Sequence, residues 1–343
     1  MTDIKSLSFD ELKNEIASLA LPSYRAEQIY KWLHVNGVSS FDEMTDLSKD
    51  LRSRLKEAYL IPVCEIEEKY ESKLDSTVKY LFRLYDGEYI ESVVMKYKYG
   101  YTICISSQVG CRMGCSFCAS TLAGFGRNLL PAELEGQIHS AQRDLGIRIS
   151  HIVLMGIGEP LDNFDNVIKF LHTVNHEKGL NISLRDITLS SCGIVPKIYA
   201  LIDEKLPITL TLSLHAPNDE IRDKMMPVNK KWGVDEVIKA CREYAEKTKR
   251  RVSFEYTLIK DVNDSEECAR ELAKKLRGFI SHVNLIPVND VEERGNVRSG
   301  DEAVRKFQSV LQSLGINATI RRTLGKDINA SCGQLRRRKK VDE

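Results

Sequence analysis

The chain has 343 residues, of which 42% are hydrophobic and 29% are charged, and its 50 basic and 49 acidic side chains leave a formal net charge of +1. A chain of this length can bury a large core, and its charge balance does not by itself indicate a nucleic-acid-binding protein. The first residues are polar and no apolar run is long enough to cross a bilayer, so we expect a cytoplasmic protein without membrane contact. Its nine cysteines are expected to be reduced thiols, because the chain is neither short nor secreted in character.

Residues 1 to about 60 are expected to form a small helical module. The capping-box pattern S-x-x-E begins at Ser8 and again at Ser40, and apolar residues recur between them with helical spacing. The segment 22–33 carries Tyr, Arg, Lys and Trp on an expected helix. That composition is compatible with RNA contact and equally with packing against neighbouring helices.

A β-rich stretch follows, and after it strands and helices alternate. Alternating β and α units indicate a parallel sheet, and about six such units are fewer than the eight of a closed TIM barrel. We therefore predict an α/β fold built on a partial, TIM-like (β/α)6 barrel. The expected strands lie near 78–84, 89–97, 101–106, 151–156, 186–190, 208–214, 252–258 and 282–287, and the expected helices near 131–145, 164–176, 195–203, 234–248, 265–277 and 301–314.

Four of the nine cysteines lie between Cys104 and Cys118, and three of them, Cys111, Cys115 and Cys118, form the pattern C-x3-C-x2-C. Thiolates this close in sequence can bind one soft metal centre. Iron-sulfur clusters normally take four thiolates, so three leave one iron free to bind a substrate or cofactor. The alternative is a structural zinc ion, which normally adds a second cysteine pair or histidines.

Most other candidate residues follow a predicted barrel strand. Because the carboxyl ends of parallel strands share one rim of a barrel, residues far apart in sequence are expected to meet around one pocket. These residues are Gly158 and Glu159, Ser190, Ser213, His215 and Asn289, together with the three cysteines after the first core strand.

Four further motifs extend beyond the cysteines: SSQVGC at 106–111, GIGEPLDN at 156–163, SLHAPN at 213–218 and DINASCGQL at 327–335. With them the chain resembles the RlmN/Cfr family of radical S-adenosylmethionine (SAM) RNA adenosine methyltransferases, in order and over nearly its whole length. The resemblance implies the partial barrel of the radical SAM type. The expected domains are an RNA-contacting accessory domain (1–62), a β-rich lead-in (63–100), the barrel core (101–323) and a catalytic-cysteine loop with a basic tail (324–343).

The resemblance also implies the cofactors. Cys111, Cys115 and Cys118 would hold one four-iron, four-sulfur cluster, whose open iron chelates the amino and carboxylate groups of SAM. Gly158 and Glu159 would bind the amino end of SAM. Ser190, Ser213, Leu214, His215 and Asn289 would line its carboxylate, ribose and adenine. Cys192, and isoleucine in place of methionine in the GIG motif, depart from the family pattern without removing a donor.

Three catalytic residues follow from the same resemblance. Cys332 would receive a methyl group from one SAM, and a second SAM would be cleaved in the same turnover to activate that methyl group. Cys104 would resolve the protein-RNA adduct and form a transient disulfide with Cys332. Glu91 would accept a proton near the target base. An external electron donor such as flavodoxin or ferredoxin is implied.

The expected product is 2-methyladenosine, in 23S rRNA at the peptidyl-transferase centre and in tRNA next to the anticodon. A Cfr-type C8 methyltransferase is the closest alternative, but Val109 and Pro160 stand where that branch carries cysteine and alanine. A non-catalytic RNA-binding protein with a structural metal is a third possibility. The target adenine must leave its base stack to react. Basic clusters at 230–231, 247–251 and 321–322 are expected to be ordinary solvated side chains, whereas the cluster at 336–340 fits RNA contact as well. We expect a monomer.

Overall fold

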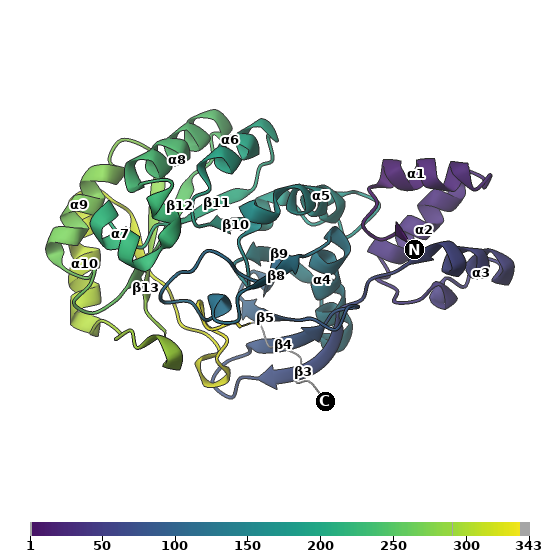
Figure 1. Ribbon diagram of the computed structural model, residues 1–343, viewed down its shortest axis with the longest axis horizontal. Coiled ribbons are helices and arrows are strands. Elements are labelled where there is room, and N and C mark those ends of the chain that lie inside the picture. The colour runs from purple at the N-terminus through teal and green to yellow at the C-terminus, as the bar shows by residue number, and fades with distance from the viewer. Residues whose placement is uncertain (1, 290, 337–343) are drawn as a thin grey trace.

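The computed structural model describes residues 2–289 and 291–336 and consists of a small helical module beside a larger α/β body (Figure 1). The module contains α1 (Phe9–Ser18), α2 (Tyr24–His34), the 3-10 turn η1 (Phe41–Glu43) and α3 (Lys49–Ala58). Both predicted capping boxes are present, at Ser8 and at Ser40. The module has an apolar core of its own, which includes Leu12, Ile16, Ile29, Leu33, Leu51 and Leu55.

The larger body is organised around one ten-stranded sheet with the order β14-β13-β12-β11-β10-β9-β6-β5-β4-β3. Neighbours from β6 to β14 pair in parallel, whereas β3, β4, β5 and β6 pair antiparallel. The strands are β3 (Glu65–Glu71), β4 (Val78–Arg83), β5 (Tyr89–Tyr97), β6 (Gly100–Cys104), β9 (Ile149–Leu154), β10 (Ile187–Ser191), β11 (Thr209–Ser213), β12 (Val252–Leu258), β13 (Ser281–Pro287) and β14 (Ala318–Ile320).

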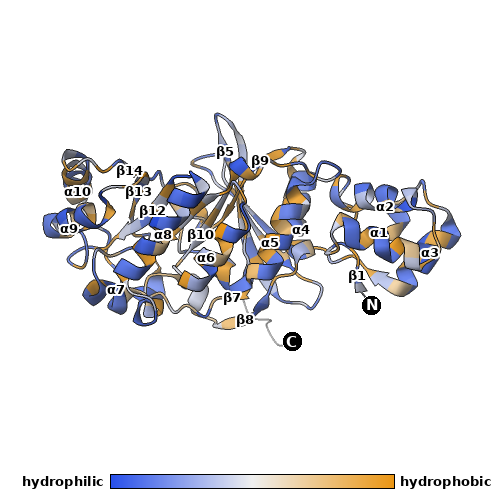
Figure 2. Ribbon diagram, turned by 90° about the horizontal axis from the view of Figure 1, so that it is seen from above, coloured by the Kyte–Doolittle hydropathy of each residue, from blue (hydrophilic) through white to orange (hydrophobic). Residues whose placement is uncertain are grey.

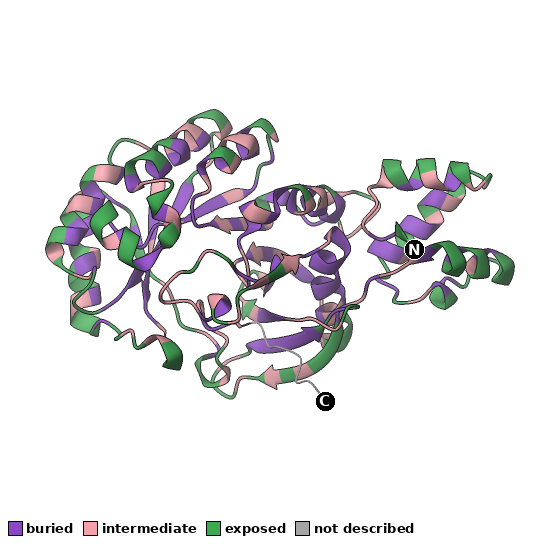
Figure 3. Cartoon of the chain, in the orientation of Figure 1, coloured by how far each residue is buried: buried purple, intermediate pink, exposed green. Residues whose placement is uncertain are grey.

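Helices surround the parallel strands on the outside. Figure 2 shows these helices banded by apolar and polar residues, and Figure 3 shows the strands buried and the outer helix surfaces exposed. Six strand-helix units run from β6 to α10, so the predicted partial barrel is confirmed. The helices are α4 (Pro131–Leu145), α5 (Phe164–Asn175), α6 (Val195–Asp203), α7 (Asp219–Met225), α8 (Val234–Thr248), α9 (Glu266–Leu276) and α10 (Asp301–Ser313).

Six strands and one helix were not predicted, and the longest of these strands is β3 at the other edge of the sheet. The strand β14 adds a seventh parallel strand at the sheet edge, β7 (Gln108–Gly110) pairs antiparallel with β8 (Phe125–Asn128), and α7 follows β11. A two-stranded parallel pair, β1 (Thr2–Asp3) with β2 (Tyr59–Leu60), joins the two ends of the helical module.

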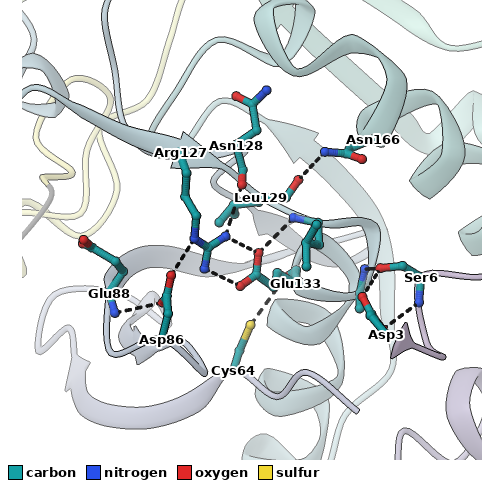
Figure 4. A network of polar contacts seen from close by, with 12 residues as sticks. Asp3, Ser6, Cys64, Asp86, Glu88, Arg127, Asn128, Leu129, Glu133 and Asn166 are labelled. Carbon is teal, nitrogen blue, oxygen red and sulfur yellow. Dashed lines mark hydrogen bonds and ion pairs between the residues drawn. The ribbon is translucent and has the colours of Figure 1, made fainter. Parts of the chain in front are cut away.

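The start of α4 is the point where several segments of the chain are joined (Figure 4). Both carboxylate oxygens of Glu133 accept hydrogen bonds from the Arg127 guanidinium at 2.7 Å, and one also accepts the N–H of Leu130 at 2.9 Å. Arg127 in turn pairs with Asp86 in the β4–β5 turn at 2.6 Å. Ala132, the residue before Glu133 in α4, donates its N–H to Ser6 Oγ at 3.0 Å, so the network reaches the helical module.

A buried His-Glu-His group also connects the module to α4. Glu135 Oε2 lies 2.7 Å from His34 Nδ1, and Glu135 Oε1 lies 3.1 Å from His139 Nε2. Burial lowers the pKa of His139 to about 4. Burial acts to raise the pKa of Glu135, but the two histidines outweigh it and hold that pKa well below its ordinary value.

None of the helices in the described ranges combines the length and the apolar character that a membrane span requires. The helical module has an apolar core separate from that of the α/β body, whereas the antiparallel strands share the sheet and the core of the barrel. The division at residues 62, 100 and 323 stays a prediction.

Candidate active site

A pocket opens at the carboxyl ends of the parallel strands, and its empty space, including the open mouth, is ≈ 960 Å³. Ten of the thirteen predicted site residues line it. They are Cys111, Cys115, Cys118, Gly158, Glu159, Ser190, Ser213, His215, Asn289 and Cys332. Residues from six different strand-helix connections and from the end of the chain therefore meet in one place, as the shared rim of a parallel barrel predicts.

The other three predicted residues lie close by but outside this lining. Cys104 lines an adjoining pocket that also contains Cys332. Leu214 is fully buried behind the rim. Glu91 is buried on β5 and contacts the C-terminal segment, where its carboxylate accepts the N–H of Arg336 at 3.0 Å.

The cysteine loop after β7 is fixed to neighbouring segments by its backbone. Ser116 donates its N–H to Met225 O at 2.9 Å at the end of α7, and Cys118 donates to Cys115 O at 3.3 Å. All three motif cysteines are free thiols, and burial raises the pKa of Cys111 to about 12 and the pKa of Cys115 and Cys118 above the ordinary value. Thiols in such a setting stay protonated until a metal replaces the proton.

These residues fit an iron-sulfur cluster by the chemistry of their donors. Three soft sulfur ligands line one pocket, and Glu159 and Glu255 are acidic side chains in the same lining. Among the described residues, no three Cys, His, Asp or Glu side chains are grouped tightly enough to hold a single metal ion. A four-iron cluster has a different requirement, because each thiolate binds a different iron.

Two glycines allow the loop after β9 to approach the segment after β6. A Cβ atom on Gly156 would lie 2.6 Å from Ile105 O. Gly158 has φ +105°, and a Cβ there would lie 2.6 Å from Gln108 Cβ. The GIG motif is therefore required by close packing, and it brings Glu159 to the pocket.

The Glu159 carboxylate is held by backbone donors. Its two oxygens accept the N–H of Leu161 at 3.0 Å and of Cys192 at 2.8 Å. Burial nevertheless raises the pKa of Glu159. A cationic ligand group in the pocket, such as the ammonium group of SAM, would favour the ionised form of this carboxyl.

His215 occupies a constrained position at the end of β11. Its φ is +59°, its Nδ1 accepts the N–H of Thr257 at 2.9 Å, and its carbonyl accepts from Asn263 Nδ2 at 2.7 Å. Burial lowers the pKa of His215 to about 3. The imidazole is therefore neutral at pH 7 with its proton on Nε2, and its ring packs edge-on against Phe117 with centroids 4.8 Å apart.

Two arginines belong to the site although the sequence patterns did not indicate them. Arg222 on α7 is completely buried and donates to the carbonyls of Leu214, Ser213 and Cys192. Arg321 lines both pockets and lies 3.3 Å from Glu255 Oε2. The expectation that Arg321 is an ordinary solvated side chain was wrong, because the residue directly after β14 places its guanidinium beside Glu255 in the pocket lining.

The C-terminal loop brings Cys332 into the pocket. Asn289 Nδ2 donates to Cys332 O at 3.0 Å, and Ala119 donates its N–H to Gly333 O at 2.8 Å. Asn289 therefore contacts the Cys332 loop and also lines the pocket. Burial raises the pKa of Cys104 to about 12, and the nearby Cys332 adds to the increase while Arg321 opposes it.

Of the basic tail at 336–340, only Arg336 is within the described part of the chain. Its guanidinium pairs with Glu293 at 2.7 Å, and residues 337–340 lie outside the described residues. The other predicted basic clusters, at 230–231 and 247–251, line neither of the two pockets around Cys332.

Comparison with known proteins gives matches over nearly the whole chain. Residues 105–273 match the model of the radical SAM superfamily, and residues 2–61 match that of the ribosomal RNA large subunit methyltransferase N-terminal domain. A probable dual-specificity RNA methyltransferase RlmN from Lachnospira eligens is 55% identical over 98% of this chain and 96% of its own length. Its counterpart from Lachnoclostridium phytofermentans is 53% identical, over 98% and 94%. The crystal structure of a radical SAM methyltransferase from Sphaerobacter thermophilus is 40% identical, with a TM-score of 0.94 over 98% of this chain and 99% of its own.

Proposed function

Because this chain belongs to the RlmN family of radical SAM RNA methyltransferases, we propose that it methylates carbon C2 of adenosine in 23S rRNA and in tRNA. Family membership establishes a SAM-dependent RNA methyltransferase and sets aside the non-catalytic RNA-binding alternative. The observation that supports the finer proposal is the meeting of Cys332, Cys104 and the three motif cysteines around two adjoining pockets.

The chemistry of adenine explains why the proposed reaction needs two additional cysteines. C2 lies between two ring nitrogens and is electron-poor, so it does not attack the methyl group of SAM directly. A thiolate does, and we propose that Cys332 accepts the methyl group and carries it to the base. The cluster, when bound, would supply the electron that cleaves a second SAM.

The residues of this chain have separate tasks in that scheme. Cys111, Cys115 and Cys118 would hold the cluster, and Glu159 with Gly158 would bind the amino end of SAM. The serines, Leu214, His215 and Asn289 would bind the rest of SAM.

Cys104 lines the same pocket as Cys332, which supports the proposal that it displaces the RNA from Cys332. That step would leave a disulfide between the two sulfurs, which must be reduced before the next turnover. We propose an external donor such as flavodoxin or ferredoxin for the electron that cleaves SAM, and a monomeric enzyme.

Product mapping tests the proposal directly. The anaerobically reconstituted protein is incubated with SAM, reductant and either a 23S rRNA fragment or a tRNA transcript, and the RNA is digested to nucleosides. Mass spectrometry and NMR then locate the new methyl group. We expect 2-methyladenosine from both RNA types. Exclusive formation of 8-methyladenosine would favour the Cfr-type alternative, and modification of only one RNA type would remove the dual specificity.

A further inference from the structure

The loop that carries Cys332 has little regular secondary structure of its own. Between Gly325 and Gly333 its only element is the short 3-10 turn η7 (Lys326–Ile328), and Gly325, Asn329 and Gly333 all have positive φ. A segment of this kind owes its position to contacts made by other parts of the chain. The two antiparallel strands β4 and β5 supply two of these contacts.

One contact lies on each side of Cys332. Lys79 on β4 donates from Nζ to Asn329 O at 3.4 Å, three residues before the cysteine. Glu91 on β5 accepts the N–H of Arg336 at 3.0 Å, four residues after it. The two side chains thus hold the two flanks of one loop.

Lys79 and Glu91 are also partners of each other. Lys79 Nζ lies 3.7 Å from Glu91 Oε1, and their side chains are 8% and 1% exposed. The ammonium also lies 5.0 Å from the centre of the Tyr70 ring. In the β4–β5 register Lys79 pairs with Val93 and Leu81 with Glu91, so both charged side chains project from the sheet face that carries Cys104 opposite Val93.

A buried ion pair of this kind is weak support for a purely stabilising role. Desolvation of two charges can cost as much as their attraction returns, and apolar replacements are often as stable. A buried ion pair does fix the positions of the groups around it, because each charge requires its hydrogen-bonding partners to stay in place. Here two of those partners are backbone groups of the Cys332 loop.

We propose that Lys79 and Glu91 form a clamp that positions Cys332, an inference that rests on the proposed methyl-carrying role of that cysteine. Both are positioning residues, since neither lines the pockets around Cys332. The clamp gives Lys79 a positioning task and gives Glu91 a task distinct from proton transfer to the base. Small displacements of a reacting group can lower a rate a hundredfold, so the position of the loop affects every step that uses the Cys332 sulfur.

Hydrogen exchange tests the clamp without reference to catalysis. Exchange of the peptide covering 325–336 is measured by mass spectrometry in the full-length protein and in the K79M, K79R and E91Q variants. The matched control is K73M, because Lys73 lies in the neighbouring turn, is exposed and contacts the loop only through its backbone N–H. Thermal unfolding checks that each variant is folded.

We expect K79M to speed exchange of the loop roughly tenfold to a hundredfold, the size expected when a buried charge-assisted hydrogen bond is lost. K79R keeps the charge and the donors and should stay within about threefold of the natural protein. Exchange of the loop in K73M should match that in the natural protein. E91Q keeps an oxygen that can accept from Arg336 and should therefore loosen the loop less than K79M.

The second measurement is the rate at which Cys332 becomes S-methylated when the reconstituted enzyme is mixed with SAM, followed by peptide mass spectrometry. K79M should slow it roughly tenfold or more, in parallel with the exchange result. If K79M does not fold, the neutral pair K79M/E91Q replaces it, with the same expected loss of protection. Natural-like exchange of the loop in a folded K79M or K79M/E91Q protein overturns the clamp. Absence of Cys332 methylation in the natural protein overturns the proposed function instead, and leaves the exchange result to decide the clamp.

Discussion

Arg222 offers a sharp test of how the pocket is assembled. The side chain lies on α7, is completely buried, and donates from Nε to Leu214 O at 2.9 Å and from Nη1 to Asn229 Oδ1 at 2.9 Å. Its Nη2 donates to Cys192 O at 2.7 Å and to Ser213 O at 3.2 Å. One guanidinium therefore connects the carboxyl ends of β10 and β11 and the residues that follow them, a region that includes four of the seven predicted SAM-binding residues, Ser190, Ser213, Leu214 and His215.

The magnitude follows from those four bonds. Methionine has a similar length but no donor, so R222M leaves four buried acceptors without this partner, at about 1–3 kcal/mol each. The variant also removes the cost of burying a cation, which is several kcal/mol and acts in the opposite direction. That cost is visible in Arg222 itself, because burial lowers its pKa. We expect a net loss of about 3 kcal/mol in the free energy of unfolding.

Urea unfolding of R222M, R222K and K224M measures this loss. R222K keeps the charge but not the planar fork, so it should fall between the natural protein and R222M. Lys224 lies on the same helix with its side chain 71% exposed, and K224M should change stability by less than about 0.5 kcal/mol. SAM affinity of folded R222M should fall by at least about tenfold. A loss below about 1 kcal/mol with unchanged SAM affinity would refute the structural role given to Arg222.

Three other changes give independent tests. G158A should abolish SAM binding, because Gly158 has φ +105° and an added Cβ would clash with Gln108. In the control G146A the added Cβ would meet no atom within 4 Å, and the substitution should lower the free energy of unfolding by only about 1 kcal/mol. Acid should destabilise the protein through His139, whose pKa is about 4 in the folded protein and 6.5 as the ordinary value. As the pH falls, the unfolded chain therefore binds the proton before the folded protein does, and the free energy of unfolding should fall by about 2 kcal/mol between pH 8 and pH 5. In H139Q the same urea titrations should show a flatter pH profile, and an unchanged profile contradicts this assignment. C104A should leave RNA covalently attached to the protein under turnover conditions, seen as a shifted band on a denaturing gel. The control C64A removes a buried thiol that lines neither pocket around Cys332 and should give no such band.

The barrel helices could be predicted from the sequence almost residue by residue. The helices expected at 131–145, 195–203 and 234–248 have these bounds in the structure. Each begins beside a proline or glycine and shows regular apolar spacing, so the local signal and the packed structure agree. The convergence of the motifs at one rim was predictable for a related reason, since it follows from parallel topology alone.

The missed elements are those whose formation depends on distant partners. The strand β14 has three residues, two of them exposed, so it shows no buried alternation; pairing with β13 creates it. The β7–β8 pair spans the cysteine loop, where glycine and cysteine mask any strand pattern. Such segments become strands because a neighbour offers hydrogen bonds, which no local pattern records.

The same reason explains the two arginines. An arginine in a sequence is most often solvated, and the burial of Arg222 depends on carbonyl groups from segments up to thirty positions away. Arg321 sits in a pair of basic residues, yet its neighbour Arg322 is exposed while Arg321 faces the site. Only the register of β14 distinguishes the two.

The antiparallel strands hold the C-terminal segment at the edge of the sheet opposite to β14. β14 and β3 are the first and last strands of the ten-stranded order, and the segment that follows β14 runs to the β3–β4 turn, as the yellow chain beside β3 and β4 in Figure 1 shows. There Asp327 accepts from Ser72 Oγ at 2.7 Å and from the N–H of Lys73 at 2.8 Å. The chain thus connects the two sheet edges across the open side of a barrel that six units cannot close, and Cys332 lies on that connection. A closed eight-unit barrel would have no such gap, so the incomplete barrel and the extra strands together create the place where a loop cysteine can reach the pocket.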